Sequence, residues 1–187
     1  MTKGHWEHIQ GWFDFQQVYD QAVRDAPVAA HFVEVGSWKG KSAAYMLEQI
    51  QASGKRIQFD CVDTWEGSDE APHLGDPAVI AGTLFDVFTA NMLPFAGHYK
   101  AMRGPSVAVA EQYEPGTLSF VFIDASHDYQ NVVSDIKAWL PLIRPGGVLA
   151  GHDYNHAPVR EAVSDTLGAV RVIGHSWWLD KPVGGAV

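Results

Sequence analysis

Short apolar runs of strand-like composition alternate in this chain with longer segments whose apolar residues recur at helical spacing, and this alternation limits the possible folds more than any other feature. A strand–helix–strand alternation is typical of a mostly parallel sheet with helices on both faces. The carboxyl-terminal segment predicts two short strands around Gly174, which would add an antiparallel hairpin at one edge. We therefore expect a doubly wound α/β fold with a seven-stranded sheet. The predicted strands are 31–35, 57–62, 98–102, 118–123, 148–150 and two within 170–179, and the predicted helices are 12–26, 42–52, 78–92, 106–112, 129–142 and 158–167.

Length and composition are those of one globular domain. The chain has 187 residues, of which 47% are hydrophobic and 19% charged, and no linker or repeat divides it, so we expect a single domain over 1–187. The net charge of −9 disfavours a nucleic-acid-binding surface and favours a neutral or cationic substrate or a metal ion. No signal core or run of about 18 apolar residues is present, which predicts a cytoplasmic protein without membrane association. The single cysteine, Cys61, lies in an apolar run and is expected to be a buried thiol.

Three predicted strand ends carry residues suited to a nucleoside ligand, because ligands of open α/β sheets bind beyond the carboxyl ends of strands. Gly36 and Gly40 follow the first strand and allow a tight turn and close approach of a ligand to the backbone. Their spacing is neither that of a dinucleotide-binding turn nor that of a P-loop. Asp63 lies 27 residues beyond Gly36, where a carboxylate could accept hydrogen bonds from ribose hydroxyls; the alternative is an Asx turn or a helix cap. Ser106, after the third strand end, could border an adenine.

Two further strand ends carry carboxylates and imidazoles. Asp124 and His127 follow the most apolar predicted strand, and His152 and Asp153 follow the next one. If these strands are neighbours, their side chains converge on one point, where two carboxylates suit Mg²⁺ or Mn²⁺ and a bound His152 would admit Fe²⁺, Co²⁺ or Ni²⁺. The alternative is a structural histidine–aspartate pair. His127 suits a general base because its ordinary pKa lies near neutral pH.

The motifs in these strand ends together resemble those of the class I S-adenosylmethionine (SAM)-dependent methyltransferases. They are similar in particular to a small metal-dependent branch that includes the macrolide- and aminocoumarin-sugar O-methyltransferases and, distantly, catechol O-methyltransferase. The resemblance extends over about residues 12–178, and its most specific part is the pair of motifs at 122–129 and 140–154. In related sugar enzymes the residue before the second aspartate is often acidic, whereas here it is His152, which bears on the choice of metal. The segments that carry the resemblance read VEVGSWKGKS, VDTW, FIDASHDY and LPLIRPGGVLAGHDY.

The resemblance implies a Rossmann-like sheet, SAM as cofactor and a divalent metal, with Mg²⁺ favoured and Mn²⁺ or another ion as alternatives. It implies His127 as the general base, with a metal site at Asp124, His152 and Asp153. The cofactor-binding residues that it predicts are Glu34, Gly36, Ser37, Trp38, Gly40, Ser42, Asp63, Thr64, Trp65, Arg103, Gly104, Ser106 and Asp124.

The expected activity is therefore methyl transfer from SAM to a hydroxyl of a small molecule, either a sugar or a phenol. A non-haem iron oxygenase using His127, His152 and Asp153 is an alternative, as is a SAM-binding protein without catalysis. A nicotinamide-dependent oxidoreductase is disfavoured by the missing glycine motif. We expect an amino-terminal lid within 1–28, a substrate-side loop and helix within 66–95 and a possible homodimer. Trp6, Trp12 and Phe13 are candidates for the lid, Trp177 and Trp178 for the acceptor pocket, and Trp139 for the core.

Overall fold

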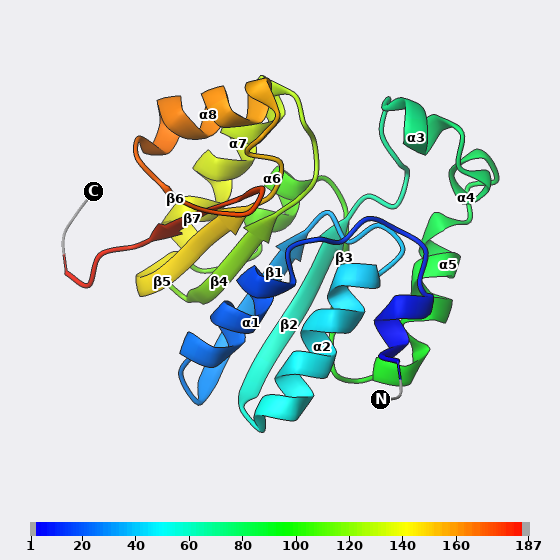
Figure 1. Cartoon of the computed structure of the whole chain (residues 1–187), viewed down its shortest axis with the longest axis horizontal. Helices are drawn as coiled ribbons and strands as arrows, with labels where there is room; N and C mark the ends of the chain where they lie inside the picture. Colours follow the sequence, from blue (N-terminus) through cyan, green and yellow to red (C-terminus); the bar gives the residue numbers. More distant parts are fainter. Residues whose placement is uncertain (1–2, 185–187) are drawn as a thin grey trace.

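A mixed seven-stranded sheet forms the centre of the computed structural model, which describes residues 3–184 (Figure 1). The strand order is β3-β2-β1-β4-β5-β7-β6. The first five strands are parallel, and β7 pairs antiparallel with both β5 and β6. The predicted doubly wound, Rossmann-like sheet with a carboxyl-terminal antiparallel hairpin is confirmed. The strands are β1 Ala29–Val35, β2 Arg56–Asp63, β3 Lys100–Arg103, β4 Leu118–Ile123, β5 Ile143–Gly151, β6 Arg171–Ile173 and β7 Ser176–Asp180.

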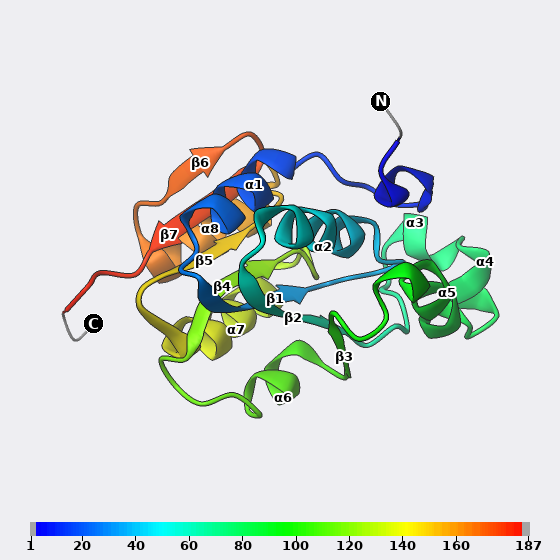
Figure 2. The same ribbon diagram turned by 90° about the horizontal axis from the view of Figure 1, so that it is seen from below.

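Helices cover both faces of this sheet (Figure 2). One hydrophobic cluster joins α1, α2 and α5 to one face, and a second joins α6, α7 and α8 to the other. Cys61 is a buried free thiol, as predicted. Within residues 3–184, no helix is long and apolar enough to cross a membrane. The helices are α1 Gln16–Asp25, α2 Lys41–Ser53, α3 Ala71–Leu74, α4 Pro77–Ile80, α5 Leu84–Asn91, α6 Ser106–Ala110, α7 Tyr129–Trp139 and α8 Ala157–Leu167, with short 3-10 turns η1 His5–His8, η2 Leu93–Phe95 and η3 Leu140–Leu142.

The strand order reverses between β1 and β4, which pair with each other although five α-helices and two strands separate them in the chain. From β1 the chain continues to β2 and β3 on one side, and it returns through β4 to β5 on the other. All six residues of β4 are buried, in agreement with its continuous apolar sequence. The carboxyl ends of β1 and β4 therefore lie at the position where an open α/β sheet binds its ligands.

Three predicted helices differ from those observed. The expected helix over 12–26 begins only at Gln16, because residues 12–15 have no regular structure. The expected helix over 78–92 is wrong: α4 and α5 are separate, because Gly82 between them has a left-handed backbone with φ of 66°. The expected helix over 129–142 ends at Trp139, because Pro141 cannot continue the α-helical hydrogen bonds and residues 140–142 form a 3-10 turn. Trp139 itself is fully buried, as expected for a core residue.

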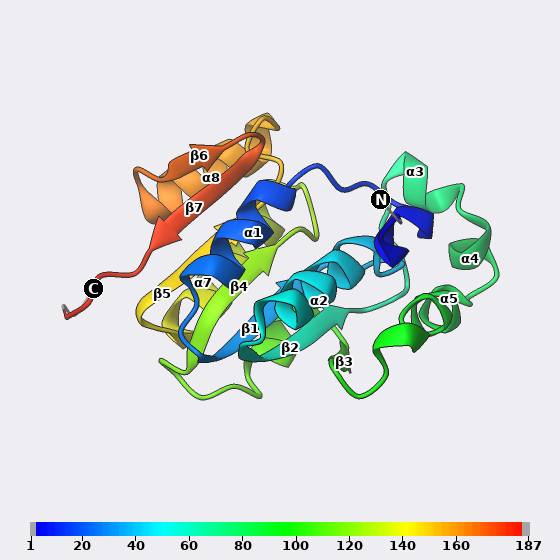
Figure 3. The same cartoon turned by 60° about the horizontal axis from the view of Figure 1, so that its bottom comes forward.

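Two segments lie over the carboxyl ends of the strands, and we call them the amino-terminal flap (residues 3–15) and the lid (residues 66–83). Figure 3 shows the flap running from η1 to the start of α1, and Trp12 of the flap packs beside His73 of α3. Both are tied to the turn after β1 by Lys39, whose Nζ contacts Asp76 Oδ2 of the lid at 2.5 Å and Gln10 Oε1 of the flap at 2.8 Å. The Lys39 and Asp76 side chains are both buried. One cation thus holds the two segments together.

Candidate active site

The turn after β1 passes directly over the end of β4. Gly36 N–H donates to Val62 O at 2.8 Å, and Asp124 N–H donates to Val35 O at 2.8 Å. Gly36 has φ of 95°, and a Cβ atom there would lie 1.9 Å from Asp124 O. Only glycine fits this position, because the backbones of the two strand ends touch. Gly40, with φ of 90°, is the N-cap of α2 four residues later.

Left-handed backbone at residues other than glycine is confined, among residues 3–184, to three positions: Trp38, Trp65 and Asp153. They follow β1, β2 and β5, at the same edge of the sheet. A bulky residue rarely adopts this conformation, because its Cβ is crowded by the backbone, and such strain concentrates at functional sites. The strained positions thus coincide with three of the residues predicted from the sequence.

Asp63, the last residue of β2, joins the turn after β1 to the turn after β2. Its Oδ2 accepts a hydrogen bond from Trp38 N–H at 2.8 Å, and its Oδ1 accepts one from Trp65 N–H at 2.7 Å. Burial raises the pKa of Asp63, and these two hydrogen bonds act in the opposite direction. The contact with Trp65 is the Asx turn considered as the alternative. The ribose-binding role of Asp63 stays a prediction, and each oxygen has a further lone pair for it.

Trp38, after β1, and Trp65, after β2, have different surroundings. The Trp65 ring is buried between Phe85 and Phe88, and its Nε1 donates to Trp38 O at 2.8 Å. Trp65 therefore supports the turn after β1 from the core side. The Trp38 ring lies on the outer side, where it stacks on His73 of the lid at a centroid distance of 4.1 Å. Trp12 of the flap packs beside the same His73 ring.

Glu34, Ser37 and Ser42 are buried beneath the turn. Tyr19 O–H donates to Glu34 Oε2 at 2.5 Å, and burial raises the pKa of Glu34 to about 7. Within residues 3–184, Glu34 Oε1 and Ser37 Oγ have no hydrogen-bond partner. Such atoms are uncommon in folded proteins.

The remaining predicted cofactor residues lie at the ends of β2 and β3. Gly104 N–H donates to Asp63 O at 2.9 Å, which joins the two strand ends. Arg103 is exposed, and its Nε donates to the carbonyl of Thr64 at 3.3 Å. Ser106 begins α6, and its hydroxyl accepts a hydrogen bond from Trp139 Nε1 at 2.8 Å. Their roles in cofactor binding stay predictions.

The second group of predicted residues meets at the ends of β4 and β5. The parallel register aligns Ile123 with Gly151, so Asp124 and His152 follow their strands side by side. Ligand atoms of Asp124, His152 and Asp153 all lie within 4.8 Å of one another. Gly151 cannot be larger, because a Cβ atom there would lie 2.5 Å from the Trp177 ring. The expectation that these side chains converge is confirmed.

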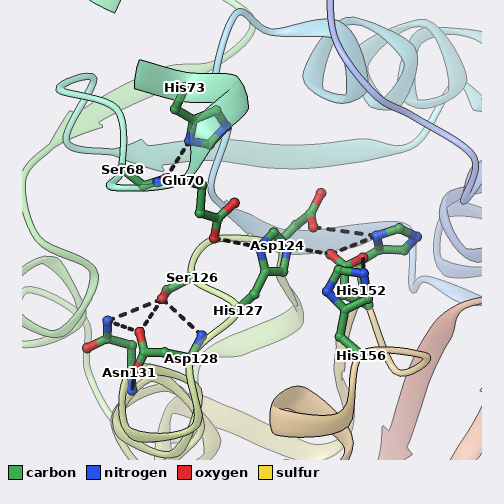
Figure 4. Close-up of polar contacts among 11 residues, drawn as sticks. Ser68, Glu70, His73, Asp124, Ser126, His127, Asp128, Asn131, His152 and His156 are labelled. Atoms are coloured by element: carbon green, nitrogen blue, oxygen red, sulfur yellow. Dashed lines mark hydrogen bonds and ion pairs between the residues drawn. The ribbon is translucent and has the colours of Figure 1, made fainter. Parts of the chain in front are cut away.

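His127 connects this cluster to the lid (Figure 4). Its Nε2 lies 2.7 Å from Asp153 Oδ2, and its Nδ1 lies 2.7 Å from Glu70 Oε1. The hydrogen bond to Asp153 is the main cause that raises the pKa of His127 to about 9; partial burial opposes this, and Glu70 adds to it. In this arrangement both ring nitrogens of His127 carry hydrogen at neutral pH, and the cationic ring bridges two carboxylates.

The two aspartates have opposite pKa shifts. Burial raises the pKa of Asp124 to about 7. Burial also opposes ionisation of Asp153, but hydrogen bonds with His127 and His152 hold its pKa well below the usual range. A divalent cation between the two carboxylates would offset the cost of burying Asp124 as an anion. Two carboxylate oxygens and one imidazole nitrogen form a donor set that fits such a cation.

Several residues of this site had no signal in the sequence. Glu70 lies 57 residues from His127, and Asp14 contacts His152 Nε2 at 2.8 Å from the flap. His156 packs its ring beside that of His127. No spacing rule relates residues so far apart in the chain. Trp178, which we expected at the acceptor pocket, is instead a buried core residue. Trp177 is also buried, but it borders the small cavity lined by Asp124 and His152, so its role at the acceptor stays a prediction.

Comparison with known proteins is consistent with this geometry. Residues 33–154 match the model of a family described as "Methyltransferase domain". Among curated proteins, the uncharacterized protein y4gI of Sinorhizobium fredii (strain NBRC 101917 / NGR234) is 22% identical over 121 residues. That alignment covers 65% of this chain but only 13% of y4gI, so the chain spans a small part of the length of the relative it matches.

Solved structures share the fold at low sequence identity. The O-methyltransferase NovP has a TM-score of 0.68 and 14% identity, with 89% of this chain and 79% of NovP covered. The calicheamicin methyltransferase CalS11 has a TM-score of 0.66 and 14% identity, with 88% and 76% covered. Cofactor-bound Rv0187 from MTB has a TM-score of 0.63 and 15% identity, with 95% and 87% covered.

Proposed function

The chain belongs to the family of methyltransferase domains, and from this premise we propose that it transfers a methyl group from SAM to a hydroxyl group of a small molecule with the help of a divalent metal ion. The observation that carries the proposal is the meeting of Asp124, His152 and Asp153 at the ends of β4 and β5, with His127 hydrogen-bonded to Asp153. Family membership favours this activity over the iron oxygenase considered from the sequence.

SAM would supply an electrophilic methyl group on its sulfonium. The turn at Gly36 would lie against the cofactor, because it follows β1 at the point where the strand order reverses. The unpaired Glu34 Oε1 and Ser37 Oγ lie at the same turn. Asp63, at the end of the neighbouring strand, would accept hydrogen bonds from the ribose hydroxyls.

Asp124, His152 and Asp153 would hold the metal ion. The chemistry that such an ion supplies is acidification of a coordinated hydroxyl and stabilisation of the resulting oxyanion. Both carboxylates have ionisation behaviour that suits this role: Asp153 stays ionised, whereas Asp124 becomes ionised readily once positive charge is close.

His127 would accept the hydroxyl proton at Nε2. Glu70 faces Nδ1, so it favours the tautomer that carries hydrogen on Nδ1 and leaves Nε2 bare. The proton that His127 shares with Asp153 must leave first, and it leaves more easily when the charge of Asp153 is balanced by another cation. His127 and Glu70 would thus act as a base and its orienting partner.

The acceptor that we propose is a small hydroxyl compound, either a sugar or a phenol. The likeness to CalS11, which one of its structures describes as a TDP-rhamnose 3′-O-methyltransferase, supports a sugar. The lid and the amino-terminal flap lie over the strand ends and would border the acceptor.

The test combines SAM binding and turnover. Calorimetry should detect SAM binding to the wild-type protein, and methyl transfer to a panel of sugars and phenols should require a divalent ion. Asp153→Ala should abolish turnover and leave the SAM dissociation constant within about threefold, because Asp153 would contact the ion rather than SAM. Asp25→Asn, an exposed change at the far end of α1, serves as the control. No SAM binding by the wild type at millimolar concentration, or full activity of Asp153→Ala in EDTA, would refute the proposal.

A further inference from the structure

The His152 ring lies between two groups of carboxylates. Its Nδ1 is 3.1 Å from Asp153 Oδ2 and 3.6 Å from Asp124 Oδ1. Its Nε2, on the opposite side of the ring, is 2.8 Å from Oδ1 of Asp14, a residue of the amino-terminal flap. The ring also packs against Phe15 at a centroid distance of 4.8 Å, and only 14% of the side chain is exposed. Each ring nitrogen therefore faces a different carboxylate group.

Asp14 is itself held in place from two directions. Its second oxygen, Oδ2, lies 3.2 Å from Nδ1 of His175, in the turn between β6 and β7. The next residue, Phe15, is buried and packs against Phe122 of the sheet. The Asp14 carboxylate is thus fixed between two imidazoles although its own side chain is more than half exposed.

Resting on the proposed function, we propose that Asp14 is a positioning residue: it fixes His152 with Nδ1 toward Asp124 and Asp153 and so gives the metal site a nitrogen ligand that selects Mn²⁺ over Mg²⁺. A metal-binding histidine generally donates its other N–H to a carboxylate, which sets the tautomer and the ring orientation. Asp14 provides that carboxylate. The Asp14 and His152 atoms are in ion-pair contact at 2.8 Å, and Nε2 has no other polar partner within the described residues.

The ligand set determines the preference among ions. Mg²⁺ binds oxygen ligands almost exclusively, whereas imidazole nitrogen suits Mn²⁺ less than the later transition metals but better than it suits Mg²⁺. Two carboxylates alone would not distinguish Mn²⁺ from Mg²⁺ strongly. Because His152 contributes nitrogen only when its ring is held in this orientation, Asp14 controls the selectivity without touching the ion.

Binding of each metal alone tests this inference. Calorimetry with MnCl₂ and with MgCl₂ should show one ion per chain and at least tenfold tighter binding of Mn²⁺. Asp14→Asn should weaken Mn²⁺ binding by about tenfold and Mg²⁺ binding by less than threefold. His152→Asp, which replaces the nitrogen donor by oxygen, should bring the two dissociation constants within about threefold. Asp25→Asn should behave as wild type, and circular dichroism verifies folding of each variant.

Pulsed electron paramagnetic resonance of the Mn²⁺ complex gives a readout that a merely structural role of Asp14 would not change. Coupling to an imidazole nitrogen should be present in the wild type, weakened in Asp14→Asn and absent in His152→Asp. Unchanged Mn²⁺ binding and coupling in Asp14→Asn would overturn the inference. So would two ions per chain, one of them lost in His175→Ala, because Asp14 would then be a ligand itself. Failure of SAM binding would refute the proposed function but not this metal selectivity.

Discussion

The buried pair of Lys39 and Asp76 offers the sharpest test of how the lid and the flap are held. Their side chains are 5% and 7% exposed, and Lys39 Nζ lies 2.5 Å from Asp76 Oδ2. Asp76 also accepts a hydrogen bond from Ala78 N–H at 2.9 Å and so caps α4. Asp76→Asn keeps the shape and the cap but removes the charge, because asparagine is as good a helix cap as aspartate.

Asp76→Asn should lower the free energy of unfolding, because it leaves a charge buried away from water. Without the carboxylate, the buried ammonium of Lys39 retains only the hydrogen bond to Gln10, and leaving one charge of a buried pair uncompensated costs about 3–5 kcal/mol. Lys39→Met should cost a similar amount, because it leaves the Asp76 carboxylate buried without its cation. The double variant Lys39→Met/Asp76→Asn buries no charge, so it should recover most of the loss.

Equilibrium unfolding in urea at pH 7, followed by tryptophan fluorescence, measures these differences. A loss of about 3–5 kcal/mol corresponds to a fall in Tm of roughly 6–20 °C for a chain of this size. The stabilising effect of the pair depends on pH. Burial raises the pKa of Asp76, but the contact with Lys39 holds it below the ordinary value. The pair therefore stabilises the protein above the ordinary aspartate pKa, and this contribution is lost as the pH falls through the lowered value. A loss below about 1 kcal/mol in either single variant, or additive losses in the double variant, would refute the reasoning.

Two further predictions concern the site itself. Gly36→Ala should prevent folding or cost more than about 4 kcal/mol, because its Cβ would collide with Asp124 O at a backbone φ of 95°; a thermal melt within about 2 °C of wild type would contradict the close approach. Metal-free protein in EDTA should lose stability as the pH rises from about 6.5 to about 9. The raised pKa of His127, about 9, makes its contribution complete below the unfolded value near 6.5 and lost above the folded one. Melting temperatures across this range should fall more steeply in wild type than in His127→Gln, and equal slopes would show that His127 is not the cause.

The architecture could be predicted from the sequence because periodicity and composition act locally. The run 118–123 coincides with β4 residue for residue, and the segment around Gly174 forms the predicted hairpin. Element ends were less predictable. The break at Gly82 and the early end of α7 depend on single backbone conformations, which a periodic apolar pattern does not record.

The sequence by itself also determined which strand ends carry chemical groups. Asp124 and His127 follow one strand, His152 and Asp153 follow the next, and parallel pairing of β4 with β5 brings them together. Only the tertiary structure decided what surrounds them. Glu70 reaches His127 from the lid, Asp14 reaches His152 from the flap, and Lys39 ties both segments to the turn after β1. These contacts join residues far apart in the chain, and their geometry depends on how whole segments pack, so no local pattern specifies them.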